Sequence, residues 1–223
     1  MQIKISQVYG SQEDTDLQIV KLTLEGQFTD KEALESGWLF YDNKWYVCRS
    51  SRINIKLFNK KPKPIKGYEF VYCEFFSYDD EIKTVYDKYT TIKQFKKHYK
   101  IDSDIDRSSV IKVYHNGDIV AFTKFLKYDG ALESQFTAWD YSDPKASIGR
   151  KIVEREVDIC KSLGYEYLYI GPCYGIGSRY KTEYLGFEWW TGENWSTSND
   201  ELLNILERDS QINSLERLEH AFI

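Results

Sequence analysis

The pattern of apolar and polar residues is most regular in the second half of the chain. Strand-like runs cover residues 110–115, 118–128 and 131–141, and turn residues separate them. Asn116-Gly117 is the strongest short hairpin signal, because both central positions of a type I′ turn need positive φ. The sequence therefore predicts a three-stranded antiparallel meander in this region.

A helix is expected directly after the meander. Apolar residues at three-to-four spacing run from Ile148 to Leu163, and Gly164 follows as a stop signal. A strand is predicted over residues 165–170. A second amphipathic helix is predicted from about Asn199 to the end of the chain, with leucine and isoleucine residues on its apolar face.

The first half shows shorter signals. Thr29-Asp30-Lys31-Glu32 is a capping box that opens a short helix ending at Gly37. Two aromatic runs within residues 38–48 predict a hairpin, and residues 52–58 and 67–76 predict strands. Thr91-Ile92-Lys93-Gln94 predicts the start of another helix, which would reach about Tyr99.

This order of elements matches the core of the GNAT acyltransferase fold, in which the loop before the helix binds a pyrophosphate. Backbone N–H groups at a helix N-terminus attract such an anion, and a glycine there lets it come close. Ser147, Gly149 and Arg150 stand at that position. We therefore expect an α+β, GNAT-like fold with a mixed, mostly antiparallel sheet flanked by helices. The alternative for these three residues is a plain helix cap.

Composition narrows the class of protein. The 223 residues carry a net charge of −5, and 42% of them are hydrophobic. The chain holds 4 cysteines without a CxxC pair, so we expect a reduced, intracellular protein with no metal site. No apolar run of about 18 residues and no secretion signal is visible, which predicts a cytoplasmic protein without a membrane partner.

Charge is concentrated in one stretch. Residues 49–66 hold seven basic residues and no acid. Such a stretch on an acidic protein favours binding of a polyanion such as tRNA, although a solvated basic loop explains it equally well. The predicted nucleic-acid-binding residues are Arg49, Arg52, Lys60, Lys61, Lys63 and Lys66.

Several segments resemble the arginyl-tRNA–protein transferase family. The strongest part is residues 139–181, which includes Trp139-Asp140-Tyr141-Ser142-Asp143-Pro144 and Tyr167-Leu168-Tyr169-Ile170-Gly171. A weaker likeness extends over residues 30–190, and the family's N-terminal cysteine cluster is replaced by Ser50 and Ser51. The resemblance implies transfer of an aminoacyl group from aminoacyl-tRNA to a primary amine such as a protein N-terminus, without a tightly bound cofactor.

Candidate site residues follow from this chemistry, which needs a positioned amine and donors for the developing oxyanion. Tyr180 and Lys181 match the family motif, and Glu183 is a candidate general base together with Glu188. A glycine-rich loop just after the last core strand is expected to line the substrate pocket. Its candidate residues are Gly171, Tyr174, Gly175 and Gly177.

Two alternatives stay open. One is an acetyl-CoA-dependent N-acetyltransferase, with acetyl-CoA as donor in place of aminoacyl-tRNA. The other is a non-catalytic GNAT-like binding module that uses its C-terminal helix to dock a partner or form a homodimer. We expect a degenerate GNAT-like half over residues 1–100, a complete half over 101–198, and the amphipathic helix over 199–223.

Overall fold

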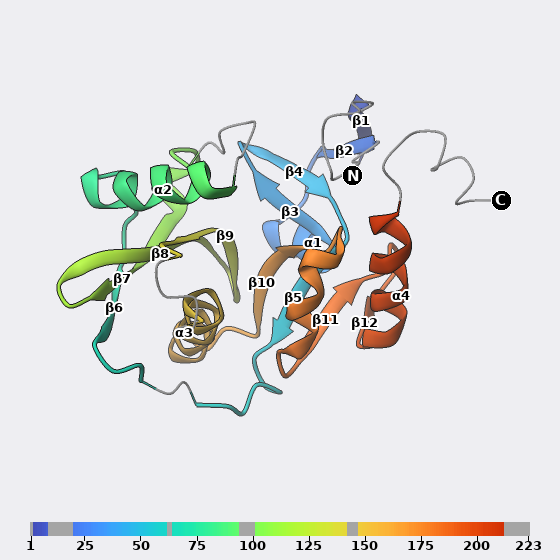
Figure 1. Ribbon diagram of the computed structural model, residues 1–223. Helices are drawn as coiled ribbons and strands as arrows, with labels where there is room; N and C mark the ends of the chain where they lie inside the picture. Colours follow the sequence, from blue (N-terminus) through green and yellow to red (C-terminus); the bar gives the residue numbers. More distant parts are fainter. Residues whose placement is uncertain (1, 9–19, 62–63, 94–100, 142–146, 212–223) are drawn as a thin grey trace. The chain divides into compact units, whose positions relative to one another are not determined.

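The computed structural model describes residues 2–8, 20–61, 64–93, 101–141 and 147–211 (Figure 1). The chain divides into two compact units. Unit 1 combines residues 1–58 with 169–223, and unit 2 covers residues 59–168. The predicted boundaries near residues 100 and 198 are a different division, and they stay predictions.

Unit 2 contains four consecutive antiparallel strands and two helices. The strands are β6 (Tyr68–Cys73), β7 (Ser108–His115), β8 (Asp118–Tyr128) and β9 (Ala131–Trp139), with η1 (Ile105–Arg107) before β7; the helices are α2 (Asp80–Lys93) and α3 (Ile148–Ser162). The strands are hydrogen-bonded in the order β9-β8-β7-β6. Helices α2 and α3 cover opposite faces of this sheet (Figure 1).

The predicted meander is confirmed in unit 2. Asn116 and Gly117 have φ of 54° and 92°, which places both in the left-handed region that a type I′ turn requires. The face under α2 holds the aromatic core of the unit. Its buried residues include Phe76, Ile82, Val85, Tyr86, Tyr89, Val110, Phe122, Phe136 and Ala138.

Unit 1 contains a small sheet, a second group of strands and two helices. The small sheet has the strand order β1-β2-β4-β3, with β1 (Gln2–Val8), β2 (Val20–Glu25), β4 (Lys44–Val47) and β3 (Trp38–Tyr41). The second group has the order β12-β11-β5-β10, with β12 (Trp195–Ser196), β11 (Phe187–Trp190), β5 (Ser50–Asn54) and β10 (Tyr167–Pro172). The helical elements are α1 (Asp30–Glu35), η3 (Ile176–Glu183) and α4 (Asn199–Ser210). Helix α4 lies against η3.

The capping box of α1 is confirmed, because the Thr29 side chain accepts from the Glu32 N–H and the Glu32 carboxylate accepts from the Thr29 N–H at 2.7 Å. Gly37 follows the helix with φ +79°, and a Cβ on it would lie 2.3 Å from the Trp190 ring. Only glycine fits both the backbone angle and this close contact. The end of α1 is therefore fixed against β11.

Two boundaries predicted from the sequence are wrong. Thr91 does not begin a helix; it lies in the last turn of α2, where its hydroxyl donates to the Asp87 carbonyl at 2.7 Å. The helix begins at Asp80, and the Asp79 carboxylate accepts from the Ile82 N–H at 3.0 Å. The strand predicted over residues 52–58 occupies Ser50–Asn54 instead, because the chain turns there, with the Leu57 N–H donating to the Asn54 carbonyl.

The predicted α+β class with a GNAT-like core order is confirmed: antiparallel strands β7, β8 and β9 are followed by α3 and then β10. The predicted C-terminal helix is present from Asn199 to Ser210. The part of it predicted beyond residue 211 lies outside the described residues, as does the loop over 142–146.

Candidate functional site

Lys181 lies inside unit 1, on η3. Its amine donates to the Ile170 carbonyl at 2.6 Å and to the Pro172 carbonyl at 2.7 Å, and its side chain is buried. Burial lowers the pKa of this amine, although Cys173 and Cys48 nearby oppose that shift. The two carbonyl groups thus accept two of the N–H groups of this amine.

Gly171 lies between those two carbonyl groups. It has φ +77°, and a Cβ on it would lie 3.7 Å from the Lys181 amine. The end of β10 therefore makes a left-handed turn around a buried lysine. In this way Lys181 holds the start of the glycine-rich loop that the sequence singled out.

A second set of polar groups lies beside the lysine. Cys48 and Ser50 are in hydrogen-bond contact, with 3.0 Å between sulfur and oxygen, and the Ser50 hydroxyl donates to the Gly37 carbonyl. Burial raises the pKa of the Tyr174 phenol, and the neighbouring Cys48 raises it further. Tyr174 therefore remains a neutral phenol. The sequence pointed to Tyr174 but gave no indication that Cys48 lies beside it.

Tyr180 and Glu183 face the surface. Tyr180 is 51% exposed, and its ring lies edge-on to that of Tyr184 with 6.3 Å between ring centres; Glu183 is exposed at the end of η3. Adjacent positions of this short helix thus point in different directions, Lys181 inward and Tyr180 outward. Tyr180 and Glu183 are thus exposed to solvent, whereas the Lys181 amine is enclosed by the two carbonyl groups that it contacts. Gly175 is the N-cap of η3 and Gly177 is the second residue of that helix, where no described atom lies within 4 Å of a Cβ added to Gly177.

The other predicted substrate-binding group belongs to unit 2, at the N-terminus of α3. Ser147 has φ 52° and its side chain makes no capping hydrogen bond. A Cβ on Gly149 would lie 3.5 Å from the Trp139 ring, and Arg150 is exposed. The first-turn N–H groups of this 15-residue helix form the kind of end that attracts an anion.

The basic stretch does not behave as one exposed surface. The Arg52 guanidinium is buried: it donates to Glu188 at 2.7 Å and lies 3.9 Å from the centre of the Trp195 ring. Arg49 donates to the Cys173 carbonyl at 3.0 Å and to Asp209 at 2.8 Å.

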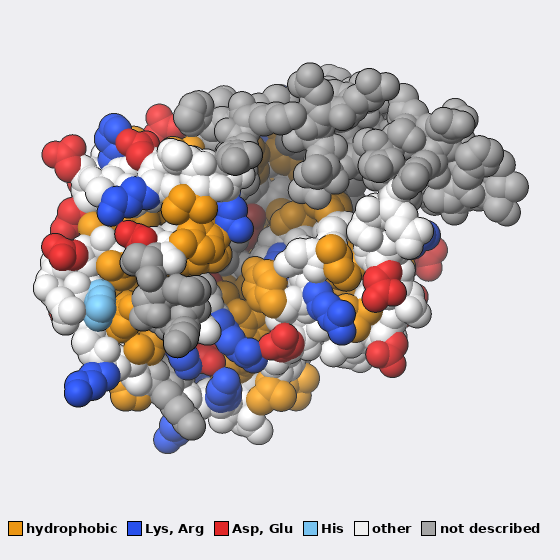
Figure 2. Space-filling view, in the orientation of Figure 1, with side chains coloured by type: hydrophobic (Ala, Val, Ile, Leu, Met, Phe, Trp, Pro, Cys, Tyr) orange, Lys and Arg blue, Asp and Glu red, His pale blue; other side chains and the backbone are white. Residues whose placement is uncertain are grey.

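The lysines of the stretch differ from the two arginines. Lys60 pairs with Glu154 at 3.0 Å, and Lys61 and Lys66 are exposed, while Lys63 lies outside the described residues. Figure 2 shows basic side chains beside acidic ones on the described surface. The nucleic-acid prediction therefore depends on the lysines, since both arginines are held by internal partners.

The cluster around Arg52 was missed by sequence reasoning. Glu188 stands directly opposite Arg52 in the β5–β11 register, and the Asn54 amide donates to its second oxygen at 3.3 Å. The Arg52 guanidinium also reaches the Tyr169 hydroxyl at 3.4 Å. The strand Ser50–Asn54 holds a single apolar residue, Ile53, so its sequence carries no signal that Arg52 is buried in an ion pair.

Within the described ranges, no group of three or more His, Cys, Asp or Glu side chains is placed to hold a metal ion. None of the helices in the described part of the chain is long and apolar enough to cross a lipid bilayer.

The comparisons with known proteins find similarity to solved structures only at the level of the fold. No family model and no curated protein matches the chain. Similar solved structures include L-PGS from Bacillus licheniformis, with TM-score 0.46 and 17% identity over 61% of this chain and 52% of that chain. Another is a GCN5-related N-acetyltransferase from Kribbella flavida, with TM-score 0.43 and 13% identity over 63% of this chain and 53% of that chain.

A third similar structure is a tandem GNAT protein from the clavulanic acid biosynthesis pathway. It has TM-score 0.38 and 12% identity, over 66% of this chain and 53% of that chain. The present chain thus spans about half the length of each of these three proteins. At these identities the likeness concerns the fold alone.

Proposed function

We propose that the protein is a transferase that moves an aminoacyl group from aminoacyl-tRNA to a primary amine such as a protein N-terminus. The observation that supports this best is the arrangement of η3. Tyr180 and Glu183 are exposed on this helix, while the buried Lys181 holds the turn at the end of β10, the strand that follows α3. The resemblance of residues 139–181 to arginyl-tRNA–protein transferases covers the same segment.

The reaction is an attack by the amine nitrogen on the ester carbonyl carbon. A C–N bond forms, the C–O bond to the ribose breaks, and one proton moves from the nitrogen to the leaving oxygen. In our proposal the Glu183 carboxylate accepts the proton from the amine, and the Tyr180 hydroxyl gives its proton to the leaving oxygen. Glu183 then releases its proton to water and the Tyr180 phenolate takes one from water, which restores both side chains. In unit 2, the N-terminus of α3 with Ser147, Gly149 and Arg150 is a separate candidate for binding a phosphate.

Lys181 has a positioning role in this proposal. Its amine fixes the carbonyls of Ile170 and Pro172, so the backbone around Gly171 is held in one conformation. Gly171, Tyr174, Gly175 and Gly177 would then line the site of the acceptor. Preorganised backbone groups lower the barrier because they need no reorganisation in the transition state.

An acetyl-CoA-dependent N-acetyltransferase is the second candidate. The observation that favours it is the N-terminus of α3, because the N–H groups there would bind a pyrophosphate and a tRNA phosphate in the same way. The two candidates differ in the donor and share the acyl transfer to an amine.

The test supplies labelled amino acids on a mixed pool of charged tRNA, with labelled acetyl-CoA in a parallel reaction and peptides of acidic or basic N-terminus as acceptors. We expect label to arrive from tRNA. We also expect Tyr180→Phe to lower kcat/KM about 10²-fold, because it removes a proton donor from an exposed position. The matched control is Tyr78→Phe in unit 2, whose ring is 38% exposed.

The outcomes separate the candidates. Label arriving only from acetyl-CoA would identify the acetyltransferase. Transfer that survives Tyr180→Phe unchanged would remove Tyr180 from the mechanism. Absence of transfer from both donors would leave the binding module, with α4 as the surface to examine for a partner or a second copy of the chain.

A further inference from the structure

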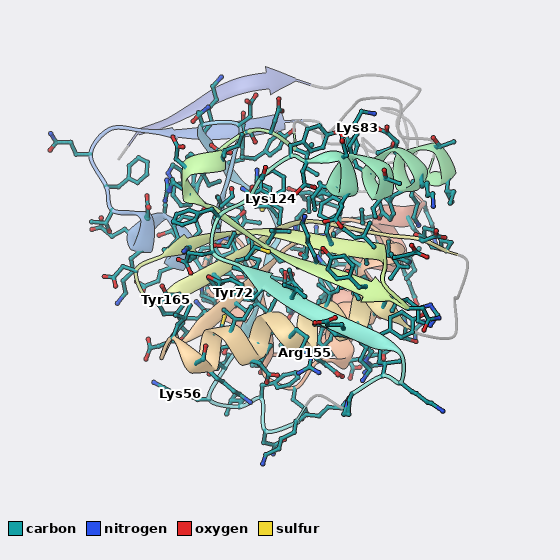
Figure 3. All side chains as sticks on the ribbon, turned by 90° about the vertical axis from the view of Figure 1, so that its left-hand side faces the viewer. Lys56, Tyr72, Lys83, Lys124, Arg155 and Tyr165 are labelled. Atoms are coloured by element: carbon teal, nitrogen blue, oxygen red, sulfur yellow. The ribbon has the colours of Figure 1, made fainter. Side chains whose placement is uncertain are left out.

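A lysine is buried in the core of unit 2. Lys124 lies within β8, two residues after Phe122, and its side chain is fully buried. Since side chains alternate along a strand, Lys124 lies on the face of the sheet under α2, where Phe122 belongs to the aromatic core. Figure 3 shows Lys124 on that side of the sheet and Arg155 of α3 on the other. The Lys124 amine lies 5.2 Å from the centre of the Phe76 ring, and a charged amine is costly in such surroundings.

The segment over residues 101–107, which we call the strap, lies against this lysine. The Lys124 amine donates to the Ser103 carbonyl near the start of the strap. At the end of the strap, the Arg107 guanidinium lies 5.0 Å from the centre of the Tyr128 ring, four residues further along β8. Two residues on the same face of β8 therefore hold the strap.

The strap holds polar groups in unfavourable positions. Within the described residues, the buried Ser103 hydroxyl and one oxygen of the Asp104 carboxylate have no hydrogen-bond partner. Asp104 also has φ 57°, in the left-handed region that residues other than glycine seldom adopt. Water would satisfy both polar groups if the strap moved away from β8. We therefore expect the strap to open at a lower free energy than the sheet beneath it.

The charges that act on the Lys124 amine are carboxylates. Asp104 and Asp102 belong to the strap, and Glu133 belongs to β9. Burial lowers the pKa of the Lys124 amine to about 8, although these three carboxylates oppose that shift. A lysine in water keeps its ordinary pKa of about 10.5. The closed strap therefore favours the uncharged amine, whereas an open strap favours the charged one.

We propose that the strap is a pH-sensitive cover on the α2 face of unit 2, which opens more readily at neutral than at alkaline pH. Opening the strap returns the Lys124 amine to water and takes up a proton, so a fall in pH from about 10 to about 8 favours the open conformation. Below about pH 8 the amine is charged in both conformations, and further acid has no effect through this group. Because Ile101 at the start of the strap belongs to the aromatic core, opening exposes core side chains.

The strap contains none of the residues assigned to the transfer chemistry, so this inference goes beyond the proposed function. Its experiments measure hydrogen exchange and titration without any substrate. Their results therefore do not depend on whether the protein transfers an aminoacyl group.

The first experiment measures hydrogen exchange of the whole chain by mass spectrometry at pH 7 and pH 9, with each rate divided by the intrinsic rate at that pH. We expect the opening constant of the strap to be about tenfold smaller at pH 9, the ratio for an amine pKa of 8 when closed and 10.5 when open. Lys124→Met keeps an apolar side chain and removes the amine. Its strap should open less readily than that of the wild type at pH 7, and equally at both pH values.

Two further variants control this experiment. Lys127→Met removes the other lysine near the end of β8, which pairs with Glu74, and it should keep the tenfold difference between the two pH values. Asp104→Asn keeps a residue type that tolerates positive φ and removes one carboxylate that favours the charged amine. Its strap should open more readily than that of the wild type at pH 7.

The second experiment titrates the amine itself by NMR of protein that carries ¹³C-labelled lysine. The Lys124 signal is identified by its loss in Lys124→Met, and we expect its midpoint near pH 8. Lys127 is the internal reference: partial burial opposes a rise in its pKa, but Glu74 outweighs burial and raises it. The Lys127 signal should therefore titrate at higher pH than a lysine in water.

Several results would overturn the inference. Equal opening of the strap at pH 7 and pH 9 in the wild type would show that no proton is taken up. An unchanged pH dependence in Lys124→Met would assign the effect to another group. Exchange of the strap and of β8 with one common opening constant would mean that only the whole unit opens. A Lys124 midpoint above pH 10 would show that the closed strap does not keep the amine from water.

Discussion

Two buried carboxyl groups, one in each unit, have opposite kinds of partner. In unit 1 the Glu188 carboxylate meets the Arg52 guanidinium at 2.7 Å and the Asn54 amide at 3.3 Å. In unit 2 the fully buried Glu156 of α3 meets the Thr123 hydroxyl at 2.8 Å, and Thr123 in turn contacts Thr137 at 3.0 Å. One carboxylate has a cation beside it, and the other has hydroxyl groups.

This difference determines how each carboxyl group can be buried. A buried ionised group needs an opposite charge with good geometry, which Arg52 supplies. Hydroxyls alone do not offset the loss of water, so burial raises the pKa of Glu156 to about 7, although Thr123 and Ser134 lower it somewhat. The stability of the protein should therefore depend on both partners of the Arg52–Glu188 pair, and at Glu156 it should depend on pH.

The largest expected effect comes from breaking the ion pair. Glu188→Ala leaves Arg52 buried without its carboxylate, and we expect the free energy of unfolding to fall by about 3–5 kcal/mol. Urea denaturation followed by tryptophan fluorescence measures the change.

The control for this prediction is the double variant Arg52→Met/Glu188→Leu, which removes both charges. It should lose less stability than Glu188→Ala, because no unpaired charge remains. A loss under about 1 kcal/mol for Glu188→Ala would contradict the prediction and would show that Arg52 reaches water when its partner is removed.

The next effect is expected at Glu156. Between pH 4.5 and about 7 the unfolded chain releases the proton of this carboxyl group while the folded chain keeps it, so the stability of the wild type falls as pH rises through that window. Glu156→Gln removes this proton exchange and keeps a carbonyl that accepts from Thr123. We expect it to be more stable than the wild type by about 3 kcal/mol at pH 8, and nearly equal at pH 4.5.

Thermal unfolding of both chains across this pH range measures the difference. Glu154→Gln is the matched control, two residues earlier on the same helix. Burial favours the protonated form of Glu154, but Lys151 and Lys60 outweigh it and lower the pKa, so this variant should be less stable than the wild type near neutral pH. A constant difference between Glu156→Gln and the wild type from pH 4.5 to 8 would mean that Glu156 does not titrate on unfolding.

Local signals explain which elements could be predicted. The turn at Asn116-Gly117 and the cap at Thr29 depend on residues next to each other in the chain, and both are present as predicted. The same kind of signal failed at Thr91, because a Thr hydroxyl can also donate to the carbonyl four residues earlier inside a helix. Local sequence alone does not separate these two uses of the side chain.

The candidate site was less predictable because its partners are distant in the chain. Arg52 was assigned to an exposed basic stretch, but its carboxylate partner stands 136 residues later on β11. The sequence also could not tell that Lys181 points inward and Tyr180 outward, since both belong to one short helix. Burial in these cases is decided by strand pairing across the unit.

The smallest effect is expected for a carboxylate that is intermediate between these two cases. Glu154 is buried, but its partner Lys60 has a side chain that is 44% exposed, and Lys151 also donates to Glu154 at 2.8 Å. Lys60→Gln should therefore lower the free energy of unfolding by at most about 1 kcal/mol, and less at high salt. Urea denaturation at low and high salt measures this, with its exposed neighbour Lys61→Gln as the control. A loss of stability as large as that of Glu188→Ala would contradict this prediction. It would show that solvent exposure of the cation does not weaken such an ion pair.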